Sequence, residues 1–425
     1  MDYAAARSLL ARLPSIEVKP GLERTRLLLE TLGHPERGYP AIHVAGTNGK
    51  GSVVAILASI LNAAGYRVGR FTSPDLIDLR DRIAIDGEWI EEERFAALTE
   101  RIAPPLGSGA DRPTLFEALT AIALAHFAEE EVDIAVVEVG LGGRFDATNV
   151  VDPILTILTN VDLDHTGILG DTIAKIAWEK AGIAKPAVPL LVGRLDEEGW
   201  AVVRAEAELV GAPIAHTDRI LIEREAPESE RAVYRIDRPR FPKRIRLPLI
   251  APYQEDNLRT ALRAVELLRE RGFPIDSEAI EEGIATVSWP GRFEVIRRDP
   301  LVVLDGAHNV AGALALADAV EALLPERSRR RLLLGILSDK DVPGIVGALV
   351  PLFSRVYVAG SSSPRSLAPE ELARHVAGFP IPHECYNSIE EGLEAALGSM
   401  KPEDSLVVAG SLTVVKEARR HLEGR

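Results

Sequence analysis

Cysteine is nearly missing from this sequence. A single residue, Cys385, occurs in 425 residues, so no disulfide bond can form within the chain. Small secreted proteins often rely on several disulfide bonds in place of a large core, and that class is therefore excluded. One thiol in so long a chain is typical of a protein from a reducing compartment.

An excess of positive charge is also missing. The chain has 49 Lys and Arg against 64 Asp and Glu, a formal net charge of −15. Proteins that bind nucleic-acid polymers or anionic membranes need a basic surface, so this balance argues against both kinds of partner. Small anions are not excluded, because a few basic residues or bound cations can concentrate positive charge locally.

Long apolar segments are absent as well. No run approaches the ~20 apolar residues of a membrane-spanning helix, and residues 1–14 lack the apolar core of a signal peptide. We therefore expect a cytoplasmic protein. The remaining composition, 46% hydrophobic and 27% charged, is that of an ordinary globular protein, and 425 residues predict two or three domains.

Apolar strands alternate with helices through the first part of the chain. The patterns predict strands at 41–45, 133–139, 154–160 and 189–193, and helices at 53–64, 115–129, 173–182 and 257–271. Such strands indicate a parallel sheet covered by helices on both faces. The alternating segments 232–237 and 244–249 predict antiparallel strands beside it.

A second alternating series begins at residue 301. It predicts strands at 301–304, 331–336, 355–359 and 405–409, and helices at 310–324, 342–352, 369–377, 389–399 and 413–423. Segments 289–293 and 297–300 have the character of a boundary. The fold class is therefore α/β. We expect a P-loop ATPase-like domain with a mostly parallel sheet at 1–294, and a smaller Rossmann-like domain at 300–425.

A glycine-rich turn with one lysine lies between the first predicted strand and helix. It reads His43-Val-Ala-Gly-Thr-Asn-Gly-Lys-Gly-Ser52. Its glycines let successive N–H groups face a phosphate chain, Lys50 is placed for the β- and γ-phosphates, and Ser52 can offer a hydroxyl to Mg²⁺. The strict phosphate-loop pattern is not met, because Val44 replaces its first glycine and Gly51 follows the lysine. A plain turn with a surface lysine stays the alternative.

This loop resembles the ATP loop of the Mur ligase superfamily, and its flanks are similar to the folylpolyglutamate synthase/dihydrofolate synthase family. Other segments that carry the resemblance follow in the family's order at 21–24, 27–33, 71–74, 137–149, 164–166, 179–183, 290–292 and 304–309. Each segment alone is weak. Together they cover nearly the whole chain and are specific.

The resemblance implies an ATP-dependent amide ligase. ATP converts a folate carboxylate into an acyl phosphate, and the amine of L-glutamate then displaces phosphate. Phosphoryl transfer needs positioning and charge neutralisation, not a protein nucleophile, and the sequence offers no Ser–His–Asp or Cys–His set. Members often also use dihydropteroate as the acceptor, so that activity stays open. Members are commonly monomers.

The resemblance also implies two Mg²⁺ sites. Their ligands would be Ser52, Ser73, Glu138, His165 and Lys180. Lys180 matches a lysine that the family often carries as a carbamate. Three alternatives stay open: Glu138 pairs with Arg144 or another cation, His165 caps the next helix, and Lys180 is an unmodified lysine on a helix surface.

Further residues are assigned by the same resemblance. ATP would contact Thr47, Asn48, Gly49, Lys50, Gly51, Ser52, Asn257 at the adenine, Arg292 at a phosphate and Asp305 at the ribose. Folate would contact Gly21, Arg24, Ser73, Pro74 and Arg82, and glutamate or the γ-phosphate His308 and Ser411. Lys50, Lys180, Asp305 and His308 would be the catalytic set.

Structural roles remain open for several of these residues. Arg292 can be a linker arginine. His308 can belong to a turn in which Asn309 caps the following helix, and Ser411 to a strand-to-helix turn. Asp75 stands where the family commonly has histidine, which leaves the preferred folate form undecided.

Two other functions are kept as alternatives. Another Mur-type amino-acid ligase would usually carry a further domain before the phosphate loop, for which the sequence leaves no room. A non-catalytic nucleotide-binding module would be expected to have lost chemical residues, whereas Lys50, Glu138 and Lys180 are present.

Overall fold

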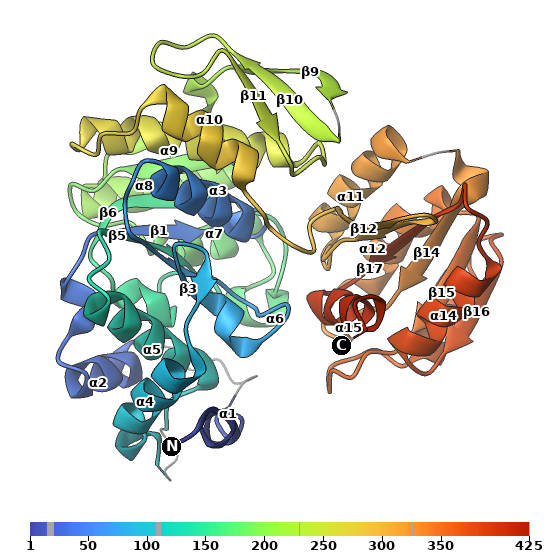
Figure 1. Cartoon of the computed structure of the whole chain (residues 1–425), viewed down its shortest axis with the longest axis horizontal. Helices are drawn as coiled ribbons and strands as arrows, with labels where there is room; N and C mark the ends of the chain where they lie inside the picture. Colours follow the sequence, from blue (N-terminus) through green and yellow to red (C-terminus); the bar gives the residue numbers. More distant parts are fainter. Residues whose placement is uncertain (15–20, 108–111, 229, 325, 425) are drawn as a thin grey trace. The chain divides into compact units, whose positions relative to one another are not determined.

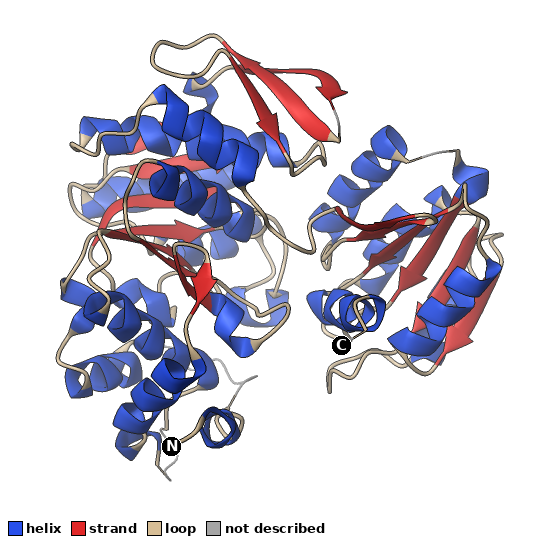
Figure 2. Cartoon of the chain, viewed as in Figure 1, coloured by secondary structure: helices blue, strands red, loops and turns tan. Residues whose placement is uncertain are grey.

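A computed structural model of the chain describes residues 1–14, 21–107, 112–228, 230–324 and 326–424 (Figure 1). The chain forms two compact units. The first comprises Met1–Asp162, Thr166–Pro248 and Asp256–Val287, and the second Leu163–His165, Leu249–Glu255 and Ser288–Arg425. In each unit, helices flank a sheet (Figure 2), which confirms the α/β class. The domain bounds 1–294 and 300–425 stay a proposal.

The main sheet of the first unit has eight strands in the order β4-β3-β2-β5-β1-β6-β7-β8. The strands are β1 (Ala41–Ala45), β2 (Val68–Phe71), β3 (Ile83–Ile85), β4 (Glu88–Trp89), β5 (Ile134–Glu138), β6 (Pro153–Asn160), β7 (Leu190–Arg194) and β8 (Ile214–His216). The four predicted strands, β1, β5, β6 and β7, run parallel as expected, and β2 and β8, which were not predicted, extend the parallel set. Strands β3 and β4 pair antiparallel at one edge.

The helices of this part of the chain are α1 (Tyr3–Leu10), α2 (Glu23–Thr31), α3 (Lys50–Ala63), α4 (Glu92–Ile102), α5 (Leu115–Glu129), α6 (Thr166–Leu169), α7 (Ile173–Ala181), α8 (Glu197–Val210), α9 (Gln254–Glu270) and α10 (Ser277–Thr286). The four predicted helices, α3, α5, α7 and α9, begin and end within three residues of the predicted bounds, and the further helices were not predicted. The start of α5 is fixed by a reciprocal cap in which Thr114 and Glu117 each accept the other's main-chain N–H. Its side chains then join the core that α1, α2 and α4 build beside the sheet.

A separate antiparallel sheet has the order β11-β10-β9. Its strands are β9 (Ile222–Glu228), β10 (Arg231–Ile236) and β11 (Arg244–Leu247). Two of these strands were predicted from alternation. The third, β9, carries a charged sequence, and ion pairs across the sheet, such as Arg244 with Glu225, stabilise it instead of a buried face.

The sheet of the second unit has six strands in the order β12-β13-β17-β14-β15-β16. They are β12 (Glu294–Arg298), β13 (Leu301–Leu304), β14 (Arg330–Leu334), β15 (Arg355–Ala359), β16 (His383–Tyr386) and β17 (Ser405–Ala409). All run parallel except β12. The last strand of the chain, β17, thus lies between β13 and β14 at the centre of the sheet.

Five α-helices, α11 (Val310–Leu323), α12 (Val342–Leu349), α13 (Pro369–Val376), α14 (Ile389–Ser399) and α15 (Leu412–Leu422), accompany this sheet. One expectation is corrected here. Part of the charged segment assigned to the boundary is instead the edge strand β12, which pairs antiparallel with β13. Arg297 and Arg298 fit there because an edge strand leaves their side chains exposed to solvent.

Among the helices of the described residues, none combines the length and the apolar character needed to cross a membrane.

Candidate active site

The predicted phosphate loop connects β1 to α3 at the carboxyl ends of the parallel strands. Gly49 precedes α3 with a φ of 81°, and no side chain among the described residues caps the helix. Asn257 of α9 lies against Gly49, so close that a Cβ there would come within 2.2 Å of its Oδ1. Ser52 is buried in the first turn of α3. Thr47, Asn48, Lys50 and Gly51 complete the loop, which is the arrangement that binds phosphate.

Two lysines meet at one main-chain oxygen of this loop. Lys50 Nζ donates to Gly46 O at 3.0 Å and to Thr47 O at 3.2 Å. Lys180 Nζ donates to Gly46 O at 2.9 Å. Lys180 is only 4% exposed, so its assignment to a helix surface is wrong. The structure therefore brings two of the four predicted catalytic residues to the same atom.

Glu138 ends β5 beside this loop, since β5 and β1 are paired. It is 4% exposed, and the main-chain N–H of Ser73 donates to its Oε2 at 3.3 Å. Pairing of Glu138 with Arg144 is wrong, because Arg144 forms its ion pair with Glu206 and lies 3.9 Å over the ring of Trp178. Pairing with another cation has support, because the charge of Glu138 acts on Arg70 and opposes the fall that burial causes in the pKa of Arg70. Ser52, Ser73 and Glu138 all offer oxygen atoms, the donors that Mg²⁺ prefers.

The predicted folate residues fall into two groups. Gly21 precedes α2, in which Arg24 is buried and forms an ion pair with Glu117 at 2.9 Å. Ser73, Pro74 and Arg82 lie in the segment between β2 and β3, where Arg82 forms an ion pair with Asp75 at 2.6 Å. The aspartate that departs from the family pattern thus has a cationic partner.

In the second unit, Asp305 follows β13 and is buried. Its carboxylate accepts hydrogen bonds from Tyr253 Oη at 2.6 Å and from the N–H groups of Phe293 and Ala307, each at 2.8 Å. Burial raises the pKa of Asp305, although these donors and the charge of Arg292 oppose the rise. Arg292, half-buried, donates to Gly291 O at 3.0 Å.

Several polar side chains surround the carboxylate of Asp164, which also belongs to the second unit. Lys340 Nζ lies 2.6 Å from Oδ1, and Asn309 Nδ2 and His308 Nε2 lie 2.9 and 3.4 Å from Oδ2. Burial opposes ionisation, but the hydrogen bond from His308 and the charges of His308, His165 and Lys340 hold the pKa of Asp164 well below its usual range. Two predicted residues, His165 and His308, are thereby brought to one acid.

Lys340 was not predicted from the sequence. Its side chain is 4% exposed, and its Nζ also lies 3.5 Å from Nε2 of His165. One signal was present, because Lys340 follows the predicted strand at 331–336 by a few residues, at the carboxyl edge where open α/β sheets bind ligands.

The structural alternatives for two residues are confirmed. Asn309 Oδ1 accepts the N–H of Gly312 and caps α11, and Ser411 Oγ accepts the N–H of Val414 and caps α15. Asn309 performs a second task at the same time, because its Nδ2 reaches Asp164. The predicted role of Ser411 toward glutamate stays a prediction.

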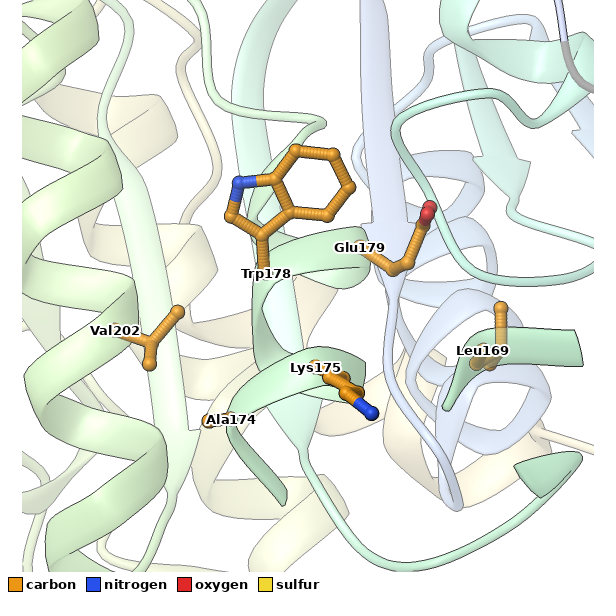
Figure 3. Close-up of a pocket in the computed structure, with 6 residues that line it drawn as sticks. All are labelled: Leu169, Ala174, Lys175, Trp178, Glu179 and Val202. Carbon is orange, nitrogen blue, oxygen red and sulfur yellow. The ribbon is translucent and has the colours of Figure 1, made fainter. Parts of the chain in front are cut away.

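A cavity of 410 Å³ lies on the surface of the first unit (Figure 3). Leu169, Ala174, Lys175, Trp178, Glu179 and Val202 line it. None of the predicted site residues is among them, and Lys175 is paired with Asp171. We assign the cavity no part in the reaction.

Two family models match this chain, each over a separate segment. The Mur ligase middle domain matches residues 44–218, and the Mur ligase glutamate ligase domain matches residues 291–412. A dihydrofolate synthase/folylpolyglutamate synthase of Bacillus subtilis is 36% identical over 431 residues, which is 99% of each chain. A folylpolyglutamate synthase of Lacticaseibacillus casei is 35% identical over 100% of this chain and 99% of its own.

Solved structures of the same kind of enzyme are similar to this chain in fold. Escherichia coli FolC in complex with DHPP and ADP is similar with a TM-score of 0.87 and 32% identity, over 100% of this chain and 98% of that one. Mycobacterium tuberculosis folylpolyglutamate synthase complexed with ADP is similar with a TM-score of 0.90 and 33% identity, over 100% and 99% of the two chains.

Proposed function

The chain belongs to the Mur ligase family, among its folylpolyglutamate and dihydrofolate synthases, and we propose from its geometry which residues carry out each part of the reaction. It is an ATP-dependent ligase that adds glutamate to folates. The observation that supports the assignment of roles is the convergence of Lys50 and Lys180 on Gly46 O, at the N-terminus of α3.

Two steps make up the proposed reaction. A carboxylate oxygen of the folate attacks the γ-phosphorus of ATP, and ADP leaves with the bond electrons. The amine nitrogen of glutamate then attacks the acyl carbon, phosphate leaves, and the nitrogen loses a proton. Positioning and neutralisation of the phosphates are what this chemistry requires of a protein.

Lys50 would perform the first of these tasks. In the structure its ammonium group is folded back onto Gly46 O and Thr47 O. If the ammonium group of Lys50 turns from these two carbonyl oxygens toward a bound triphosphate, it exchanges neutral acceptors for anionic ones. Hydrogen bonds to anionic acceptors are stronger. The N–H groups at the start of α3 would hold the same phosphates, with Asn257 at the adenine, and Arg292 and Asp305 at a phosphate and the ribose.

The residues of the first unit also fit Mg²⁺. We propose two Mg²⁺ sites, held by oxygen atoms of Ser52, Ser73 and Glu138. On the family pattern, His165 and a carbamylated Lys180 would be further ligands. When bound, Mg²⁺ supplies positive charge that neutralises the phosphate oxygens. What the chain itself contributes is the buried carboxylate of Glu138, which accepts a hydrogen bond from the N–H of Ser73.

We further propose that Lys180 is carbamylated in the active enzyme. Two buried or half-buried ammonium groups that share one acceptor are unfavourable, because like charges repel and each loses hydration. The ammonium group loses a proton, and the free amine then bonds to the carbon of CO₂ and loses a second proton, so that an anionic carbamate replaces the positive charge. The proposal predicts that removing bicarbonate lowers activity and that adding it back restores activity.

The substrate contacts follow the family pattern. Gly21, Arg24, Ser73, Pro74 and Arg82 are proposed for the folate, and His308 and Ser411 for glutamate. Dihydropteroate is a second acceptor to consider, since relatives in B. subtilis and E. coli carry both activities in their names. We propose that the enzyme is a cytoplasmic monomer, which size-exclusion chromatography tests in part.

A pair of assays tests the proposed function. The protein is supplied with ATP, Mg²⁺ and L-glutamate, and with either tetrahydrofolate or dihydropteroate, and products are identified by mass. A folate product longer by one glutamate supports the proposal, and a product from dihydropteroate adds the second activity. A different Mur-type ligase would need another amine, and ATP turnover that ignores acceptor and amine would contradict ligase activity.

A further inference from the structure

The peptide group between Gly46 and Thr47 is held at both ends. Its carbonyl oxygen accepts from Lys50 at 3.0 Å and from Lys180 at 2.9 Å. Its N–H donates to Asn160, to the main-chain O at 3.1 Å and to Oδ1 at 3.2 Å. The orientation of this one peptide therefore decides where the two ammonium groups converge.

Asn160, the last residue of β6, fixes more than one N–H of the loop. Its Oδ1 also accepts the N–H of Asn48 at 2.8 Å. Two successive N–H groups that point at one oxygen resemble the arrangement that cradles an anion in phosphate loops. Here a neutral amide oxygen occupies it, so these two N–H groups serve to hold the loop in shape.

Thr159 holds the same loop from the neighbouring position. Its Oγ1 donates to Asn48 O at 2.6 Å, and the residue is 6% exposed. It approaches Gly46 so closely that a Cβ on Gly46 would lie 1.8 Å from Oγ1. Gly46 also has a φ of 153°, which disfavours a side chain. The loop is thus fitted to the hydroxyl of Thr159.

We propose that Thr159 and Asn160 are positioning residues of the ligase reaction. They act through Gly46, Thr47 and Asn48, by fixing the peptide on which Lys50 and Lys180 converge. The proposal rests on the proposed function in one respect, the contact of Lys50 with ATP. Pairing of β6 with its neighbours uses main-chain atoms and does not require either side chain.

Two variants of Thr159 separate this role from plain packing. Thr159→Val keeps the shape and removes the hydroxyl, while Thr159→Ser keeps the hydroxyl. With the loss of about one hydrogen bond, we expect Thr159→Val to raise the KM for ATP about fivefold to tenfold and to lower kcat. Thr159→Ser should keep both within about twofold. Equal impairment of the two variants would overturn the proposal, because the hydroxyl would then not matter.

Asn160→Ala extends the test to the other residue. It removes the side-chain acceptor of the Asn48 N–H, while the Thr47 N–H keeps the main-chain oxygen of residue 160. We expect the affinity of this variant for ADP, measured by calorimetry on the whole chain, to fall about tenfold. Asn62→Ala is the matched control, since Asn62 lies in α3 and its side chain donates to exposed Asp86. The control should bind ADP as the wild-type protein does.

The outcomes also distinguish this inference from the proposed function. If the wild-type protein binds no ADP and adds no glutamate to folate, both the proposed function and the positioning role are wrong. An active wild-type protein whose Thr159→Val and Asn160→Ala variants bind ADP normally would overturn the positioning role alone. If Asn160→Ala does not fold, the Thr159 pair still decides the question.

Discussion

Several charged side chains of the candidate site are buried. Lys180 and Glu138 are each 4% exposed, and Lys340 is buried against Asp164. Removing such a group leaves its partners unpaired, and this costs stability as well as activity. Lys50 differs, because it is half-buried and its acceptors are carbonyl groups of its own loop.

Lys50→Ala should therefore separate activity from stability. We expect kcat/KM to fall about 10²–10³-fold, because a cation that neutralises the phosphates is lost. The melting temperature should stay within a few degrees of the wild-type value. Lys175→Ala, which removes an exposed lysine paired with Asp171, is the control and should change neither quantity. A parallel loss of stability and activity would indicate a structural lysine.

His43 predicts how stability depends on pH. It lies in β1, fully buried, with Nε2 2.8 Å from Thr148 Oγ1. Burial, with the charge of Lys185, lowers the pKa of His43 to about 3. The unfolded chain then binds a proton below pH 6.5 that the folded chain does not bind, so stability falls as the pH falls. From this residue we expect a loss of about 2 kcal/mol between pH 6.5 and pH 5.

Urea unfolding at pH 7 and pH 5 measures this effect. His43→Gln cannot titrate, and its amide can still donate to Thr148, so the variant should lose less stability between the two values. The free energy of unfolding of the variant should still fall somewhat between pH 7 and pH 5, because burial also lowers the pKa of His126 to about 4. An unchanged slope in the variant would show that His43 is not the group responsible.

Sequence alone identified the phosphate loop because its residues are contiguous and their chemistry depends on local geometry. For Lys180 it left a helix surface open as an alternative, because a lysine in a helix is usually exposed. Only the folded chain shows that this side chain reaches Gly46, 134 positions away. Lys340 and Asp164 were missed as a pair for the same reason, since 176 positions separate them.

At the level of helices and strands, the elements with strong apolar patterns were predictable. The bounds of α5, α14, β15 and β17 match the expected residues. The elements not foreseen include the short or charged strands β4, β9 and β12, whose pairing partners rather than their own apolar pattern make them strands. Helix α2 shows a different limit of the sequence. The family motif predicts that Arg24 contacts folate, whereas the structure buries Arg24 in an ion pair with Glu117.

Arg24→Met tests that role. Removing one partner of the buried pair between Arg24 on α2 and Glu117 on α5 should lower the free energy of unfolding by about 3–5 kcal/mol. Arg26→Met on the exposed side of α2 should change it little. Urea unfolding measures both variants. A stable Arg24→Met protein with a raised KM for folate would instead support direct contact with the substrate.

Ser411 allows a similar separation at the start of α15. Ser411→Ala loses the cap and should cost about 1 kcal/mol, whereas Ser411→Asn keeps a capping oxygen and the wild-type melting temperature. If Ser411 also contacts glutamate, the larger amide should raise the KM for glutamate more than the KM for ATP, and this is the result we expect. An unchanged KM would leave Ser411 as a helix cap alone.

For the molecule as a whole, the net charge of −15 sets which anions it accepts. The cations proposed to bind the phosphates of ATP include Lys50 in the phosphate loop, whereas the excess of acidic residues in the chain as a whole disfavours a polyanion. We expect ADP to bind and double-stranded DNA not to bind at physiological salt, as measured by calorimetry and fluorescence anisotropy. Binding of DNA with comparable affinity would reveal a basic surface that the composition does not predict.

The position of β17 has a consequence for synthesis on the ribosome. The sheet of the second unit needs this strand at its centre, yet it is the last strand to be made. Asp164 must likewise wait for Lys340, and at about 5–20 residues per second the 176 intervening steps take roughly 9–35 s. While the chain from β13 to β17 is being made, the nascent second unit exposes its apolar strands. A messenger RNA truncated before the codon for residue 405 would therefore yield a chain that lacks β17. Chaperones and proteases would bind such a chain, because the second unit could not complete its sheet.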